Sequence, residues 1–189
     1  MRLLTVGHGT ASAQELAALL TGAGVELVVD VRRHPGSRRH PDMGAENRCM
    51  RAALAGIDYL WEPRLGGRRP VPADSPDTAL REPAFRGYAA HMRTEAFGAG
   101  LDLVLGRAAS ATTAVLCAET LWWRCHRRLV ADAATLLRGV EVAHLGHGGH
   151  GGRLAPHRPT PGVRVDGDAL VYDVGETAPL PGAGTRAGE

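Results

Sequence analysis

The sequence predicts an α/β fold: a Rossmann-like open, mainly parallel sheet of about five strands with helices on both faces. Short apolar runs rich in β-branched residues alternate along the chain with stretches of helical spacing. The first such strand, helix and strand fit within residues 3–31. This spacing is typical of a βαβ unit, whose two strands are parallel and joined by a right-handed crossover.

The first half of the chain supplies three of the expected strands. Residues 3–7 form the first, and the following helix begins at a capping box made by Ser12 and Glu15. A glycine, at position 22 or 24, ends this helix. The second strand is expected at 25–31, then a helix at 45–55 and a third strand at 57–62.

The second half repeats the alternation after a loop rich in proline and arginine. We expect helices near 85–92 and 94–108, a central strand at 112–117, a helix at 124–139 and a fifth strand at 140–145. Residues 1–146 are therefore predicted to form one domain. Beyond it we expect a Gly-, His- and Pro-rich linker at 147–162, a small β-hairpin at 163–175 that turns at Asp166-Gly167, and a disordered tail at 176–189.

Composition narrows the class of protein. Apolar residues make up 44%, which is typical of a globular domain, and no apolar run approaches the roughly 20 residues of a membrane span. Three cysteines are too few for a disulfide scaffold, so we expect a cytoplasmic protein with reduced thiols and no membrane partner. The basic residues other than histidine are all arginine, and 12 of the 22 lie in three stretches, 32–51, 64–69 and 124–128. Guanidinium groups bind phosphate well, so an anionic small molecule or a nucleic acid is the expected partner.

Candidate site residues follow the predicted strands. In an open parallel sheet, ligands bind beyond the carboxyl ends of the strands. His8 follows the first strand, Asp30 ends the second, and Glu119 lies two residues past the fourth. We take Glu119, His8, Asp30 and Cys117 as candidate catalytic residues. The candidate substrate-binding residues are Arg32, Ser37, Arg38, Gly66, Gly67, Trp122, Arg124, His126 and Arg127.

Glu119 is the strongest of these candidates. We expect the neighbouring arginines to keep it ionised, and a positioned carboxylate serves as a general acid or base, or as a nucleophile toward a sugar carbon. The tryptophans beside it offer flat faces on which a base can stack. These residues point to an enzyme acting on a nucleotide or nucleic acid, with N-glycosidic bond hydrolysis as the first reaction to test. Glu119 can equally be a salt-bridge anchor for the arginines.

Two other functions remain open. Cys117 is a candidate nucleophile for sulfur transfer or phosphatase-like chemistry, or simply a small buried residue at a strand end. The chain is also compatible with a non-enzymatic nucleic-acid or nucleotide binder. No cofactor is expected. A metal is not expected either, because the gap between Cys117 and Cys125 fits no usual zinc spacing, and His144, His147 and His150 lie at the edge of or within Gly-rich sequence.

Several motifs together resemble one known family. In order they are "TVGHG", "VVDVRRHPGSRR", "LWEPRLGGRR", "FRGYAAHM" and "LCAETLWWRCHRRLVAD". They are similar to the bacterial family called domain of unknown function 488, over about residues 3–145. The resemblance implies a Rossmann-like fold and a cytoplasmic bacterial protein, and it supplies no established activity.

Overall fold

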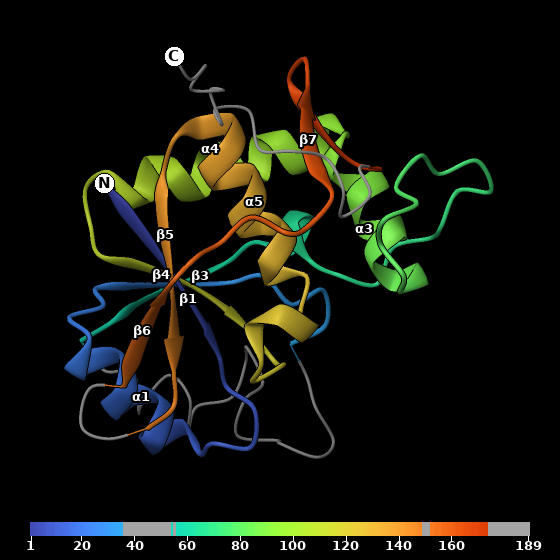
Figure 1. Cartoon of the computed structure of the whole chain (residues 1–189). Coiled ribbons are helices and arrows are strands. Elements are labelled where there is room, and N and C mark those ends of the chain that lie inside the picture. The colour runs from blue at the N-terminus through green and yellow to red at the C-terminus, as the bar shows by residue number, and fades with distance from the viewer. Residues whose placement is uncertain (36–53, 55, 149–151, 174–189) are drawn as a thin grey trace, which may run out of the picture.

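The computed structural model describes residues 1–35, 54, 56–148 and 152–173 (Figure 1). The helix expected at 45–55, the tail at 176–189 and the candidate residues Ser37, Arg38 and His150 fall outside these ranges, Leu54 excepted. Within the described ranges, no helix is both long and apolar enough to span a membrane.

A central sheet organises the chain. Its strands are β1 (Arg2–Gly7), β2 (Leu27–Asp30), β3 (Asp58–Trp61), β4 (Thr113–Cys117), β5 (Glu141–Gly146) and β6 (Arg153–Pro156). They lie in the order β3-β2-β4-β1-β5-β6. The first five are parallel, which confirms the predicted sheet, and β6 pairs antiparallel with β5. This sixth strand forms inside the stretch expected to be a linker.

The described part of the chain has four helices, α1 (Ala13–Gly22), α3 (Pro83–Met92), α4 (Glu95–Ala108) and α5 (Arg127–Arg138). Helices α1, α4 and α5 pack on the two faces of the sheet, whereas α3 packs against α4 and α5. Helix α1 begins at the predicted capping box: the Ser12 hydroxyl accepts from the Glu15 amide, and the Glu15 carboxylate accepts from the Ser12 amide. Two short 3₁₀ turns complete the described part of the chain, η2 (Pro63–Leu65) and η3 (Trp122–Arg124).

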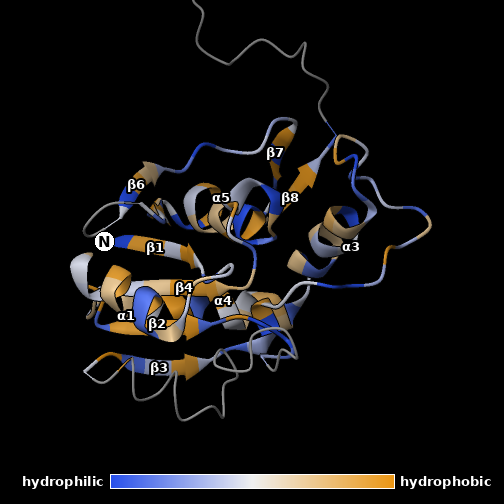
Figure 2. Cartoon of the chain, turned by 90° about the horizontal axis from the view of Figure 1, so that it is seen from below, coloured by the Kyte–Doolittle hydropathy of each residue, from blue (hydrophilic) through white to orange (hydrophobic). Residues whose placement is uncertain are grey.

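Alternating side chains of the strands fill two separate cores. Leu3, Val29 and Val115 face the core that α3, α4 and α5 cover. Leu4 and Val28 face the opposite core, which α1 covers. Figures 1 and 2 show this layering, with α1 on one side of the sheet and α4 and α5 on the other. Both faces are therefore buried, as the continuous apolar strands indicate.

The strand order places a topological switch point at the neighbouring strands β1 and β4. These strands are neighbours, yet β1 leads through α1 to β2 on the far side of β4. Strand β4 leads through α5 to β5, on the far side of β1. The two connections therefore leave in opposite directions from neighbouring strands, one through α1 on one face of the sheet and one through α5 on the other. In open α/β sheets this switch point is where ligands bind.

The predicted hairpin is present as β7 (Val163–Asp166) and β8 (Ala169–Tyr172), with Gly167 at a φ of 63° in its turn. Two buried carboxylates attach it to the domain. Asp77 accepts from the Tyr172 amide and pairs with Arg93, and Asp132 of α5 accepts from the Tyr172 hydroxyl at 3.1 Å. Strand β8 thereby packs against α3 and α5, and Figure 2 shows the hairpin beside these two helices.

Asp132 also begins a buried chain of polar contacts that reaches the sheet. It contacts His157 Nε2 at 2.9 Å, His157 Nδ1 lies 3.0 Å from His144 Nε2, and His144 Nδ1 lies 2.7 Å from the Thr5 hydroxyl. Burial, followed by the neighbouring His157, lowers the pKa of His144 to about 3. His144 is therefore neutral at pH 7, and it serves to connect strands rather than to titrate.

Candidate functional site

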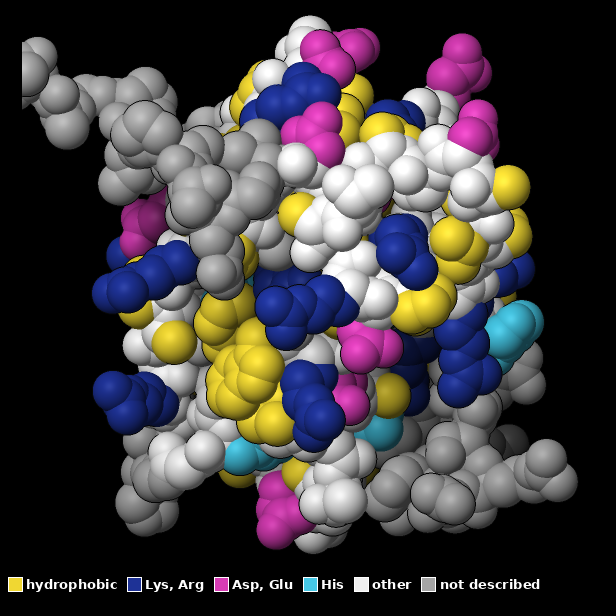
Figure 3. All heavy atoms as spheres, turned by 45° about the vertical axis from the view of Figure 1, so that its right-hand side comes forward, with side chains coloured by type: hydrophobic (Ala, Val, Ile, Leu, Met, Phe, Trp, Pro, Cys, Tyr) yellow, Lys and Arg dark blue, Asp and Glu magenta, His cyan; other side chains and the backbone are white. Residues whose placement is uncertain are grey.

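A cleft of about 1770 Å³ lies at the carboxyl ends of the parallel strands. The loops after β1, β2, β3 and β4, the start of α3 and the segment before β7 all contribute to its walls. Its polar and aromatic lining includes His8, Arg32, Arg33, His34, Arg68, Glu82, Phe85, Tyr88, Cys117, Glu119, Trp123, Arg124, Cys125, His126 and Arg128. Figure 3, which brings the right-hand side of Figure 1 forward, shows arginine side chains beside an apolar patch, with acidic side chains between them. A smaller cavity, of about 470 Å³, lies near Arg2, Glu26 and Ser110.

Close backbone approach joins the loops after β1 and β4. The amides of His8 and Gly9 donate to the carbonyls of Cys117 and Ala118, at 3.0 and 2.9 Å. A Cβ on Gly7 would lie 1.9 Å from the Glu119 carbonyl oxygen, so only glycine fits there. The glycines around His8 thus allow the approach of the chain's own loop. The amides of His8 and Gly9 are already used, so they are not free to bind an anion.

Asp30, Arg32 and His8 form a buried chain beneath the cleft. Asp30 is fully buried, and its carboxylate binds the Arg32 guanidinium through three contacts of 2.5 to 3.1 Å. Tyr59 donates its hydroxyl to the same carboxylate at 2.8 Å. Arg32 Nη1 lies 3.2 Å from His8 Nε2, and His8 Nδ1 lies 3.0 Å from the Gly9 carbonyl. Asp30 and Arg32 therefore form a buried ion pair, and His8 connects this pair to the lining of the cleft.

Arg127 contacts the backbone carbonyl of Glu119 and not the carboxylate, which was the expected partner of the arginines. Helix α5 begins at Arg127, whose side chain is 1% exposed and turns inward. Its guanidinium donates to the backbone carbonyls of Glu119 and Thr120 and, through Nε, to Cys125 Sγ at 3.4 Å. The Glu119 carboxylate instead accepts from the Leu121 amide at 3.2 Å and is exposed. Arg127 therefore holds the loop in place and is not available to bind a substrate.

The two tryptophans have opposite roles. Trp122 stacks on His144 with ring centroids 4.0 Å apart and planes 4° from parallel, so one of its two ring faces is covered by the protein itself. Trp123 lines the cleft and is 49% exposed. Arg124 also lines the cleft and is exposed, in agreement with its expected place. Arg128 lies over the Phe85 ring, 4.7 Å from its centroid.

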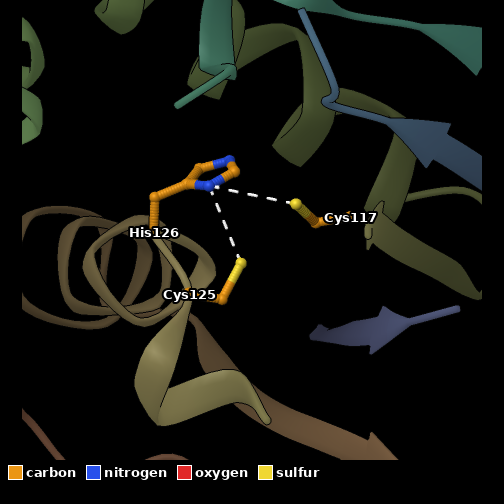
Figure 4. A group of neighbouring side chains, drawn as sticks. All are labelled: Cys117, Cys125 and His126. Carbon is orange, nitrogen blue, oxygen red and sulfur yellow. Dashed lines mark hydrogen bonds between the residues drawn. The ribbon is translucent and has the colours of Figure 1, made fainter. Parts of the chain in front are cut away.

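Three metal-ligating side chains meet at the cleft (Figure 4). His126 Nδ1 lies 3.6 Å from Cys125 Sγ and 3.9 Å from Cys117 Sγ. Both thiols are free and buried. The hydrogen bond between them lowers the pKa of Cys125 well below that of an ordinary thiol and raises the pKa of Cys117 well above it. Cys117, the predicted nucleophile, is thus the protonated member of the pair.

The predicted glycines pack against their neighbours. A Cβ on Gly67 would lie 2.9 Å from His126 Nδ1, so this residue leaves room for the imidazole. A Cβ on Gly66 would meet Arg33 Cγ at 2.4 Å and the Val31 carbonyl at 2.8 Å. Gly66 is buried away from the cleft, whereas Gly67 lines it.

Sequence reasoning left several cleft residues out of the site. Arg33, Arg68, Cys125 and Arg128 all line it. For the three arginines the signal in the sequence was their clustering, but the fold decides which members of a cluster face the cleft, and the sequence does not show this. Residues 160–162 were missed because the segment that carries them was expected to be a linker.

Comparison with known proteins places the chain in one family. The profile of the family described as domain of unknown function DUF488 matches residues 12–134, which is more than half of the sequence. The chain belongs to the DUF488 family. Neither a curated protein nor a solved structure matches it.

The DUF488 match includes most of the cleft. It runs from the start of α1 into α5 and contains Asp30, Arg32, Cys117, Glu119 and His126. Strands β5 to β8 lie beyond the match, although residues 160–162 line the cleft. The family description names no activity, so chemistry must be inferred from the residues.

Proposed function

We propose that the cleft binds a nucleotide, or the end of a nucleic-acid strand, and that the protein hydrolyses its N-glycosidic bond with Glu119 as the reacting carboxylate. The observation that carries this proposal is the exposure of the Glu119 carboxylate and its lack of an ion pair within the described part of the chain. Its side chain is exposed in the cleft, and among the described residues no arginine forms an ion pair with it. Asp30 and Glu62, in contrast, are held by Arg32 and Arg64.

The lining of the cleft supports a phosphate-bearing ligand with an aromatic ring. Arg33, Arg68 and Arg124 are exposed on its walls, and guanidinium groups bind phosphate oxygens in pairs. Trp123 offers an open ring face, and stacking a base on an aromatic side chain contributes about 1–3 kcal/mol. A nucleotide satisfies both kinds of group at once.

In the proposed reaction, the bond between C1′ of the sugar and the base nitrogen breaks, and the base leaves with the bonding electron pair. Water adds its oxygen to C1′. Glu119 accepts one proton of that water and releases it to solvent, from which the departing nitrogen takes its proton, so that a mononucleotide gives a free base and a sugar phosphate. A carboxylate facing C1′ also stabilises the positive charge that develops on the sugar ring.

The test is release of free base from a panel of nucleoside monophosphates and a single-stranded DNA oligonucleotide, followed by chromatography. Glu119→Gln is expected to lower the rate by about 10²–10⁴-fold, the usual contribution of a general acid or base. The matched control is Glu82→Gln. Glu82 is also exposed in the cleft and makes no side-chain capping bond to α3, so this variant should keep the wild-type rate. Full activity in Glu119→Gln would overturn the assignment.

Thiol chemistry is a second candidate because both cysteine sulfurs lie within 4 Å of the His126 imidazole, as a nucleophile and its base do. In the same assay it predicts that Cys117→Ser or Cys125→Ser loses turnover while Glu119→Gln does not. A non-enzymatic binder would hold the oligonucleotide and release no base. Its affinity would fall steeply with salt and rise in Glu119→Gln, since that variant has one negative charge fewer.

A further inference from the structure

We propose that Cys117, Cys125 and His126 bind one Zn²⁺ ion at the floor of the cleft. The expectation of no metal depended on the sequence gap between the cysteines, and that gap does not limit the site. Cys117 ends β4, while Cys125 and His126 directly precede α5, and the connecting turn η3 brings them together. All three ligand atoms lie within 4.8 Å of one another.

The distances fit a tetrahedral zinc site. With Zn–S bonds of about 2.3 Å and Zn–N bonds of about 2.05 Å, the edges of the tetrahedron are about 3.6 Å for S···N and about 3.8 Å for S···S. The S···N distances in the structure are 3.6 and 3.9 Å. The two sulfurs and Nδ1 point toward a common centre (Figure 4), so an ion there requires little movement of the side chains.

The surroundings favour a thiolate-bound cation. Arg127 is a buried guanidinium that donates to two backbone carbonyls and to Cys125 Sγ. It lies where an outer hydrogen bond to a zinc-bound thiolate would be made. Two thiolates and one neutral imidazole also compensate the charge of a divalent ion, and this soft ligand set selects zinc over magnesium or calcium.

The fourth coordination position would face the cleft, because all three ligands line it. Three protein ligands with one open position is the composition of catalytic zinc sites, whereas structural sites have four protein ligands. Zinc bound there would supply a water with a lowered pKa close to a substrate. The binding proposal itself does not depend on the proposed reaction.

Metal binding by the purified full-length chain tests the proposal directly. Titration with Zn²⁺ against a chromophoric chelator should give one ion per chain and a sub-micromolar Kd, unaffected by excess Mg²⁺. Substitution with Co²⁺ should give tetrahedral visible bands and a sulfur-to-cobalt charge-transfer intensity that corresponds to two thiolates. Bound zinc should also protect Cys117 and Cys125 from iodoacetamide.

Variants identify the ligands. Cys117→Ser, Cys125→Ser and His126→Gln should each weaken Zn²⁺ binding by more than the roughly 10–100-fold that loss of an outer hydrogen-bond partner costs. His91→Gln is the control, since His91 is a partly buried histidine that bonds to the Arg64 carbonyl and is not one of the three proposed ligands. Circular dichroism shows whether each variant folds.

A wild-type chain that binds Zn²⁺ more weakly than about 10 µM would overturn the site, as would a Co²⁺ spectrum without thiolate bands. The Co²⁺ spectrum of the wild-type chain tests the site even if a variant does not fold. The metal measurements use no nucleotide, so failure here and failure of the Glu119 experiment are separate results.

Discussion

Replacing Gly7 by alanine tests whether the loops after β1 and β4 form one unit under the cleft. The new Cβ would lie 1.9 Å from the Glu119 carbonyl oxygen and 2.7 Å from Arg127 Nη2. A backbone atom cannot rotate away, so the loops must separate by more than 1 Å. Overpacking of this kind costs about 1–3 kcal/mol. The two loop hydrogen bonds made by the amides of His8 and Gly9 are worth about 1 kcal/mol each.

We therefore expect Gly7→Ala to lower the free energy of unfolding by about 3 kcal/mol, which corresponds to a fall in Tm of about 6–12 °C for a chain of this size. Urea unfolding, monitored by circular dichroism, measures this change in the free energy of unfolding. Gly106→Ala is the control. Gly106 lies in α4, and beyond the helix backbone and its two chain neighbours no described atom lies within 4 Å of the new Cβ, so this variant should be more stable by about 0.5–1 kcal/mol. A loss below about 0.5 kcal/mol in Gly7→Ala would refute the close approach of the two loops.

Three further results are expected. The folded-state pKa of His144, about 3, is below the unfolded value near 6.5. Its stabilisation is therefore complete above pH 6.5 and is lost as pH falls, by about 1 kcal/mol between pH 7.5 and 5.5, a loss that His144→Gln should remove from urea unfolding curves. Trp123→Ala should weaken nucleotide binding by about 5–150-fold, whereas Trp122→Ala should reduce stability instead. Arg124→Gln should reduce the salt dependence of oligonucleotide binding, measured by anisotropy.

The fold was largely predictable because its strands and helices have strong local patterns. The buried runs at β1, β2 and β4 and the capping box at Ser12 each specify an element without help from the rest of the chain. Strand β6 was missed for the opposite reason. Its sequence is flanked by glycine and proline, and it is a strand only because β5 offers an open edge for pairing. Such pairing is a tertiary effect that a local pattern does not contain.

The location of the site was predictable, but the partner of each side chain was not. Parallel strands bring their carboxyl ends to one edge, and His8, Asp30, Cys117 and Glu119 do lie there. The sequence favoured an ion pair between Glu119 and the arginines, whereas Arg127 binds the Glu119 carbonyl instead. The choice depends on helix α5 beginning at residue 127, which turns that guanidinium inward.

The cluster of Cys117, Cys125 and His126 was likewise not predictable from local sequence spacing. Zinc spacing rules describe ligands within one turn or knuckle, and a strand end and a helix start obey no fixed gap. The contact between Gly67 and His126 is likewise long-range. Only the assembled sheet brings these residues into one place.

The most direct test is to map where a nucleotide binds. Nuclear magnetic resonance titration with adenosine 5′-monophosphate, with adenosine as the control without phosphate, reports the contacted residues. We predict shifts at Gly9, Thr120 and the Trp123 indole, and weaker binding of adenosine. Shifts confined to the smaller cavity at Glu26 and Ser110, or no shifts at millimolar ligand, would contradict the assignment of the cleft as a nucleotide site.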